Sequence, residues 1–488
     1  MKKTIIIFLS IFFSTFIYSQ SWFQMGNLDT LGNINGQKVV SGISFYENKI
    51  TIGGNFKKEN STVLNGIAQW TTNNWAPMGI GVWATPAVDS AGNGGGGLEK
   101  YKNEFYSAGV FFGAGGNYIS ETTHVCSDIA KWNGIDWNPL SGPNPPPSGF
   151  NNSCWALKVY HNNLYAGGYF GGSFDSNGIH PTQGISKWND TIFSAVGQMD
   201  GDFPPNGDFA VLDFCIYQNK LIAGGAFTSI DGSAFGTYSG IAAWDDTNWS
   251  ALGVGFNNTV SAVTVYNGEL YAGGIFTATR DNLTPLNHIA KWNGTQWQAV
   301  GEGLNDTVLV LTVDSVNNKL YAGGAFTQTG LGVQAKHIAE WTGSNWQEVG
   351  GGTNNDVFSL FAKDSNLYVG GRFTRAGNVQ TSLMACWGYG LSVGVGREES
   401  GVRSQELVVA PNPNDGEFIV STKYNVQSMK IEIRNVLGQI VYKDEEKNTN
   451  QTSIKLDAMA GIYFMSIVAD DGSTSSPQVR MNGKIIKQ

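Results

Sequence analysis

A phrase of two small residues, one variable residue and Phe recurs seven times between Gly53 and Phe373, and it constrains the fold of this chain more than any other feature. Successive copies lie 47 to 59 residues apart. That period suits a propeller blade of four short strands, whereas it is too long for one coil of a β-helix and about half of an immunoglobulin-type domain. The small pairs are Gly53-Gly54, Ala108-Gly109, Gly167-Gly168, Gly224-Gly225, Gly273-Gly274, Gly323-Gly324 and Gly370-Gly371.

Two aromatic columns follow these pairs. The first closes a phrase of the form Ile-Ala-x-Trp, at Trp70, Trp132, Trp188, Trp244, Trp292, Trp341 and Trp387. The second lies five residues later, at Trp75, Trp137, Phe193, Trp249, Trp297 and Trp346. The four intervening residues, often with Asn-Gly, predict a tight hairpin whose two aromatics face each other across the strands. We therefore expect these side chains to form core.

Trp387 has no second-column partner after it. The missing phrase stands near the start of the chain, where Trp22-Phe23-Gln24-Met25-Gly26 matches Trp297-Gln298-Ala299-Val300-Gly301. A strand at Trp22 that completes the last blade would remove both exposed sheet edges. The sequence thus predicts an all-β fold with a closed seven-bladed β-propeller over residues 20–390. Its glycines on the second strand of each blade would admit close approach of a neighbouring blade.

The composition supports an all-β fold and argues against some classes of function. Sixty-four glycines and only 14% charged residues argue against long helices, and a net charge of −9 argues against a basic nucleic-acid surface. Lys2 and Lys3 precede an apolar run that ends near Tyr18, so residues 1–19 are predicted to be a secretory signal peptide. The mature chain has no other apolar segment long enough to cross a membrane.

Four cysteines are too few for a disulfide framework in so long a chain, and none forms a Cys-x-x-Cys pair. The sequence does not decide between free thiols and a disulfide. These residues are Cys126, Cys154, Cys215 and Cys386.

The long connections between strands are expected to gather on one face of the propeller, mostly over the first four blades, and this face is the predicted site. Asp200, Asp202 and Asp208 have oxygen ligands that suit Ca²⁺, but their spacing is not that of an EF-hand and a solvated acidic turn is the simpler interpretation. No other cofactor is predicted. Asp89, Glu121 and Asp175 are the further acids from which a hydrolase or lyase could draw a catalytic pair, and no such pair can be chosen from the sequence.

His288 and His337 occupy equivalent repeat positions, which favours a structural role over a shared metal site. No nucleophile elbow, phosphate loop or zinc-protease motif occurs in the sequence.

After Trp387 the repeat stops. Residues 391–406 are predicted to be a linker, and residues 407–488 a small β-sandwich. The expected strands are Glu417–Ser421, Met429–Arg434, Gln439–Tyr442, Ser453–Leu456 and Ile462–Val468.

Both parts resemble known families. The repeats are similar to kelch-like bacterial propeller repeats, which implies the architecture but no activity, and there is no counterpart of the galactose oxidase copper motif. Residues 407–488 resemble the type A C-terminal sorting domain of the Bacteroidetes type IX secretion system. The matching phrases contain Pro411, Asn412 and Pro413, then Gly416, Gly438, Gly461 and Tyr463, and a basic ending with Lys484 and Lys487.

That resemblance implies export across both membranes to the cell surface or the medium, with the secretion machinery as partner. Within the propeller we expect a binding protein, more readily non-enzymatic than enzymatic, for a polysaccharide or a surface protein. A secreted carbohydrate-active hydrolase or lyase and a structural surface repeat protein are the alternatives.

Overall fold

The computed structural model describes residues 20–29, 38–71, 73–85, 88–91, 93–116, 125–140, 148–201, 209–388, 407–410, 417–435, 439–458, 461–470 and 479–487. The chain divides into two compact units, Met1–Gly390 and Leu391–Gln488. Every regular element in the described residues is a β-strand. The predicted signal peptide, residues 1–19, lies outside the described residues.

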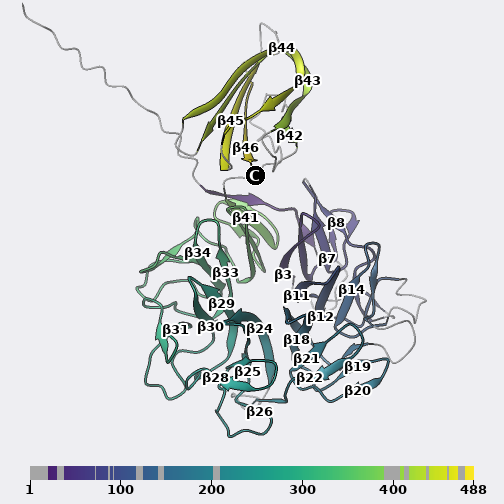
Figure 1. Ribbon diagram of the computed structural model, residues 1–488, viewed down its shortest axis with the longest axis vertical. Helices are drawn as coiled ribbons and strands as arrows, with labels where there is room; N and C mark the ends of the chain where they lie inside the picture. Colours follow the sequence, from purple (N-terminus) through teal and green to yellow (C-terminus); the bar gives the residue numbers. More distant parts are fainter. Residues whose placement is uncertain are drawn as a thin grey trace, which may run out of the picture. The chain divides into compact units, whose positions relative to one another are not determined.

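Seven four-stranded antiparallel sheets make up most of the described part of the first unit (Figure 1). We name the strand positions a to d in hydrogen-bonding order. Position a is occupied by β3 (Val39–Tyr46), β11 (Asn93–Tyr101), β17 (Cys154–Tyr160), β24 (Ala210–Tyr217), β29 (Val260–Tyr266), β33 (Val308–Asp314) and β37 (Val357–Lys363). Position b is occupied by β4 (Lys49–Asn55), β12 (Glu104–Val110), β18 (Asn163–Gly168), β25 (Lys220–Ala226), β30 (Glu269–Gly274), β34 (Lys319–Gly324) and β38 (Asn366–Gly371).

The c and d strands carry the two aromatic columns. Position c is occupied by β7 (Ile67–Trp70), β14 (Ile129–Trp132), β21 (Ile185–Trp188), β27 (Ile241–Trp244), β31 (Ile289–Trp292), β35 (Ile338–Trp341) and β41 (Met384–Gly388). Position d is occupied by β8 (Trp75–Pro77), β15 (Trp137–Asn138), β22 (Phe193–Ala195), β28 (Trp249–Ala251), β32 (Trp297–Ala299), β36 (Trp346–Glu348) and, in the seventh sheet, β1 (Ser21–Gln24). Strand β1 pairs antiparallel with β41, and Trp22 lies opposite Trp387.

The a strands of successive sheets contact each other in chain order, from β3 to β11 and onward to β37, and β37 contacts β3. Figure 1 shows β3, β11, β24, β29 and β33 nearest the middle of the unit. The predicted close approach at the strand-b glycines is confirmed. A Cβ added at Gly273 would lie 2.5 Å from Val308 Cγ1 of the next sheet, and one at Gly370 would lie 2.7 Å from Val40 Cγ1.

The predicted aromatic pairs are present in all seven sheets, with ring centroids 4.7 to 5.5 Å apart. Six of the seven d-strand aromatics are tryptophans. Each of their indole N–H groups donates to a backbone carbonyl just after the d strand of the preceding sheet, in the order of a-strand contacts. Trp75 donates to Met25 at 2.9 Å and Trp22 to Gly350 at 2.8 Å. The aromatic columns therefore stabilise each sheet and also join it to its neighbour.

Short strands in the d–a connections pair with the b–c connections. These strands are β2 (Leu28–Asp29) with β5 (Lys58–Glu59), β9 (Val82–Thr85) with β13 (Gly113–Ala114), β16 (Gly149–Phe150) with β19 (Ser173–Asp175), and β23 (Met199–Asp200) with β26 (Ser229–Ile230). Strands β6 (Thr62–Val63), β10 (Val88–Ala91) and β20 (Gly178–His180) extend three of these small sheets, and β39 (Arg375–Ala376) pairs with β40 (Val379–Gln380). The two kinds of connection thus lie together, as predicted.

The second unit is one five-stranded sheet of β42 (Leu407–Ala410), β43 (Glu417–Asn435), β44 (Ile440–Lys455), β45 (Gly461–Asp470) and β46 (Val479–Lys487). The predicted division of β43 and of β44 into two strands each was wrong, because β43 runs through both predicted segments with a register shift between Ser421 and Val426. Phe418 and Ile433, from the two halves of β43, pack in one core with Ile454 and Ile467.

Candidate binding site

Each a strand contains a β-bulge, which is a local shift in its pairing with the b strand. In six of the sheets one extra residue is inserted, and in β11 the shift spans Asn93 to Gly97. Bulges re-aim side chains and are frequent beside functional sites. The residues at the shift are Ser41, Gly96, Trp155, Leu212, Ser261, Leu309 and Phe358.

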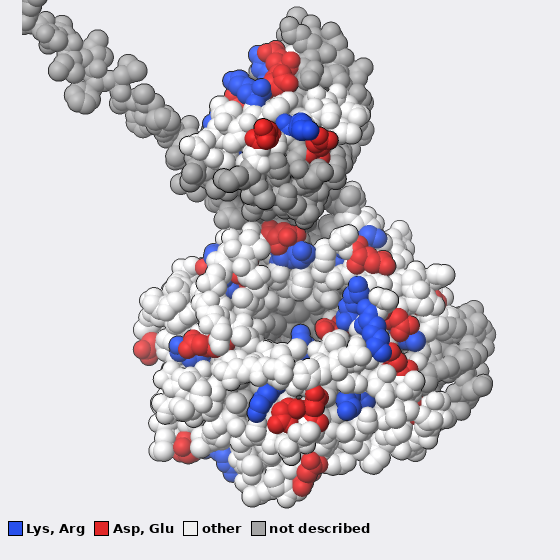
Figure 2. Space-filling view, viewed as in Figure 1, with Lys and Arg blue, Asp and Glu red and all other residues white. Residues whose placement is uncertain are grey.

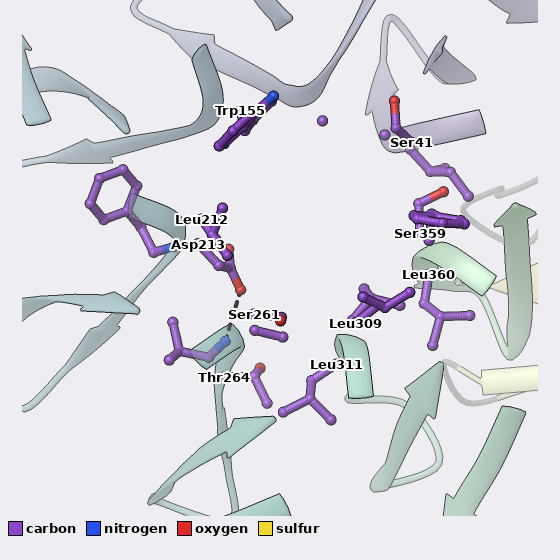
Figure 3. Close-up of a pocket in the computed structure, with 18 of the residues that line it drawn as sticks. Ser41, Trp155, Leu212, Asp213, Ser261, Thr264, Leu309, Leu311, Ser359 and Leu360 are labelled. Carbon is purple, nitrogen blue, oxygen red and sulfur yellow. Dashed lines mark hydrogen bonds between the residues drawn. The ribbon is translucent and has the colours of Figure 1, made fainter. Parts of the chain in front are cut away.

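All seven of these residues line a single cavity of about 570 Å³, which we call the a-strand cavity. Figure 2 shows a hollow at the middle of the seven-sheet unit, and in Figure 3 Trp155 and Asp213 lie on one side of the cavity with Ser41 and Ser359 across from them. The bulges lie near the first residues of the a strands.

Trp155 differs from the tryptophans of the two columns. It lines the cavity and has no ring contact with another described aromatic residue. Like several c-strand tryptophans, it is half-buried, and its indole N–H has no hydrogen-bond partner among the described residues. The equivalent residue is Ser41 in the first sheet and Ser261 in the fifth. An amphipathic ring with a free donor is available to a ligand here.

Asp213 is the carboxylate that lines the cavity. Its Oδ2 accepts from the backbone N–H of Val263 in the next sheet at 2.8 Å, and its Oδ1 accepts from Phe214 N–H at 2.8 Å (Figure 3). Burial raises the pKa of Asp213 to about 6, against the lowering effect of these hydrogen bonds and of Lys158. Asp213 therefore joins two a strands and also titrates close to neutrality.

Two cations line the same cavity. Lys158 lies close enough to lower the pKa values of both Asp213 and Glu99, although burial, the larger effect, raises the pKa of Glu99 overall. The Arg372 guanidinium lies over the Phe358 ring, 4.6 Å from its centroid. The cavity thus combines aromatic, hydroxyl and charged groups, the mixture typical of small-ligand sites.

The three aspartates of the predicted calcium site are only partly visible. Asp200 lies in β23, where its Oδ1 accepts from Gln183 Nε2 at 3.2 Å, and Asp202 and Asp208 lie outside the described residues. Among the described residues no cluster of three or more His, Cys, Asp or Glu is arranged to hold a metal ion. The calcium site stays a prediction.

The other acids and the histidines have structural contacts where they are described. Asp175 is fully buried and accepts from the backbone N–H of Phe193 at 2.7 Å, and His180 beside it helps to lower its pKa. Glu121 and the side chain of Asp89 lie outside the described part. His288 and His337 each bond through Nδ1 to a glycine carbonyl of their own sheet at 3.2 Å, which agrees with the structural interpretation.

The four cysteines are free and buried. Burial raises their thiol pKa values, that of Cys386 to about 12, so they are protonated at neutral pH.

Sequence reasoning missed Trp155 and Arg372. Both could have been found by setting aside the residues that the repeat pattern explains and examining those that remain. Trp155 is one of two tryptophans outside the repeat columns, the other being Trp83, and Arg372 is the one cation at the variable position of the Gly-Gly-x-Phe phrases.

Residues 408–479 match the family model of the secretion system C-terminal sorting domain. Of the residues that carried the resemblance, Tyr463 is buried in the core of this sheet, Gly461 pairs with Lys487, and Phe464 pairs with Lys484. Pro411, Asn412, Pro413, Gly416 and Gly438 lie outside the described residues.

Ulvan lyase NLR42 from Nonlabens ulvanivorans is 34% identical over 88 residues, which are 17% of this chain and 16% of that protein. The match therefore spans far less than two thirds of either chain. Two structures of the extracellular domain of BT4673 from B. thetaiotaomicron align with 92% and 91% of this chain and 81% and 80% of theirs, at 10% identity. Their TM-scores of 0.21 and 0.20 are too low to relate the folds.

No helix in the described part of the chain has the length and apolar character of a membrane span. The sorting domain is the part of the chain that a family model identifies. The protein is a type IX secretion cargo that is delivered to the cell surface or the medium.

Proposed function

We propose that the seven sheets form a closed seven-bladed, kelch-like β-propeller that binds a saccharide in its a-strand cavity after export. Closure is supported by the contact of β37 with β3 and by the pairing of β1 with β41. The indole bonds from Trp75 to Met25 and from Trp22 to Gly350 link the seventh sheet to both neighbours.

The observation that carries the binding proposal is Trp155 at its bulge. A sugar ring presents apolar C–H faces and a hydroxyl edge, and Trp155 offers an aromatic face and an unpaired N–H. Ser261 and Thr264 line the same cavity and can hydrogen-bond with hydroxyl groups. A volume of about 570 Å³ falls within the range of ligand-binding clefts and cavities.

A hydrolase or lyase is the second candidate, and Asp213 is the observation that favours it. A carboxyl group with a pKa of about 6 beside a cavity is a candidate proton donor or acceptor. Against this, both oxygens of Asp213 already accept backbone hydrogen bonds. We therefore place binding first.

The test is a screen of the full secreted chain against a polysaccharide and oligosaccharide library, followed by titration calorimetry. We expect binding to at least one saccharide, and Trp155→Ala should weaken it at least tenfold, since a stacked aromatic contributes about 1–3 kcal/mol with its buried area. Ile135→Ala, at an 82% exposed apolar side chain of a c–d turn, is the control and should bind like wild type. Release of reducing ends or unsaturated sugars would favour the enzyme, and Asp213→Asn should then abolish it.

A further inference from the structure

We infer that the a-strand cavity selects an acidic saccharide, and that Arg372 pairs with a uronate carboxylate of this ligand. The inference rests on the proposed function, because it names the class of saccharide that the same cavity takes.

Among the described residues, Arg372 has no acceptor for its charge. Its guanidinium Nε is buried and has no hydrogen-bond partner, and no described carboxylate lies within ion-pair distance of it. Buried polar groups in proteins are nearly always paired, so an unpaired one beside a cavity points to a partner outside the chain. An anionic oxygen on the ligand would neutralise the charge of this guanidinium.

The repeat itself does not require a cation at this position. The equivalent residues in the other six sheets, which follow the same small pair, are Asn55, Val110, Tyr169, Ala226, Ile275 and Ala325. None of them is charged, and the sheets form equally well around them. The role of Arg372 is therefore specific to the cavity of this chain.

The Phe358 ring lies beneath the Arg372 guanidinium. The ring is the bulge residue of β37, and the guanidinium carbon lies 4.6 Å from its centroid. Stacking of this kind occupies the face of the guanidinium and leaves its edge N–H groups for an acceptor. A planar fork of donors suits a carboxylate, which it can bind through two parallel hydrogen bonds.

Lys158 is the other cation that lines the cavity, and the carboxyl groups of Glu99 and Asp213 lie near it. Arg372 is therefore the cation of the cavity wall that has no carboxyl group within ion-pair distance and none nearby among the described residues that line the cavity.

Arg372 belongs to the seventh sheet and Trp155 to the third, on different sides of the cavity. One sugar ring stacked on Trp155 would not also place its own carboxylate at Arg372. The ligand that uses both residues is therefore a disaccharide or longer, with the uronate at the Arg372 end.

The test compares trisaccharides of galacturonate and of mannuronate with their methyl esters, which keep the shape and lose the charge. Calorimetry on the full chain should give a Kd at least tenfold lower for one acid than for its ester. Arg372→Gln should remove this preference, and Arg372→Lys should restore less than a third of the lost affinity, because an ammonium group cannot form the paired bonds. Arg375→Gln, at an exposed arginine of β39, is the matched control and should leave the preference unchanged.

The outcomes separate the two proposals. Equal binding of acid and ester, with both lost in Trp155→Ala, would leave the saccharide site standing and overturn the acidic selection. Preference for sulfated sugars without preference for uronates would overturn the carboxylate assignment. Absence of binding to any saccharide would overturn the proposed function itself. The comparison of acid and ester on the wild-type chain needs no variant to fold.

Discussion

Single residues in this protein depart from the repeat where they face the a-strand cavity. The column tryptophans are fixed by pairing with an aromatic across the hairpin, and six of them also donate to the neighbouring sheet. Trp155 has neither arrangement. A residue that departs from the repeat pattern and makes no contact that stabilises the fold is a strong candidate for a ligand contact.

Asp128 gives a prediction at this scale. It is 8% exposed and accepts from Phe111 N–H at 2.9 Å, and burial raises the pKa of its carboxyl group to about 7. The folded state thus holds the proton more tightly than the unfolded state, so the contribution of Asp128 to the free energy of unfolding falls as the pH rises from about 4 to about 7. Asp128→Asn keeps the acceptor and tolerates the backbone φ of 65°.

The variant should therefore be more stable than wild type at pH 8, by about 2–4 kcal/mol at roughly 1.4 kcal/mol per pH unit, and equal to it near pH 4. Chemical denaturation across this pH range measures the difference. Parallel stability curves for the two proteins would show that the Asp128 pKa is not raised.

The sequence predicted the aromatic columns because their spacing is constant, and it predicted the partner of Trp387 by the same count. It could not predict the cavity. A bulge adds only one residue to an a strand. Because the connections before the a strands vary in length, one extra residue cannot be recognised from the spacing of the repeats. Arg372 and Phe358 stand 14 residues apart in the sequence, and only the pairing of β37 with β38 brings them together.

At the scale of the element, the second glycine of the b strand packs against the backbone at the start of the a strand in six of the seven sheets. A Cβ at Gly324 would lie 2.1 Å from the backbone oxygen of Thr307 and 3.1 Å from Val308 Cα. These are backbone atoms, which cannot move aside as a side chain can. The two small residues therefore have different neighbours. The first packs against the next sheet, and the second packs against the a strand of its own sheet beside the bulge.

We accordingly expect Gly324→Ala to destabilise the protein by about 2 kcal/mol or more, the usual cost of forced overpacking. Gly171→Ala is the control, because its added Cβ would meet nothing closer than 3.7 Å. Thermal unfolding of both variants compares the two positions. Equal melting temperatures would show that the bulge can adjust without the glycine.

The C-terminal unit shows a limit of sequence reading at the same scale. The alternation of apolar residues predicted separate strands at Glu417–Ser421 and Met429–Arg434. Strand β43 continues through this stretch because the register shift between Ser421 and Val426 absorbs the irregularity.

At the scale of the whole molecule, β1 is the segment on which the proposed closure depends. Deletion of Ser21–Gly26 would expose the edge of β41, remove the Trp22 partner of Trp387 and leave the Trp75 indole N–H without its Met25 acceptor. We expect a large fall in melting temperature and a tendency to aggregate through the open edge. Gln24→Ala, at an exposed side chain of the same strand, should have little effect. An unchanged melt after the deletion would refute closure by this strand.

The seventh sheet draws β1 from before all other strands and β41 from the end of the repeats. Residue 21 stands more than 360 residues before the end of its partner strand in the sequence. The other six sheets each take their strands from one continuous stretch of the chain, whereas the seventh can form only when the two ends of the unit meet. A truncation anywhere before Trp387 would consequently remove β41 and also leave β1 without a strand to pair with.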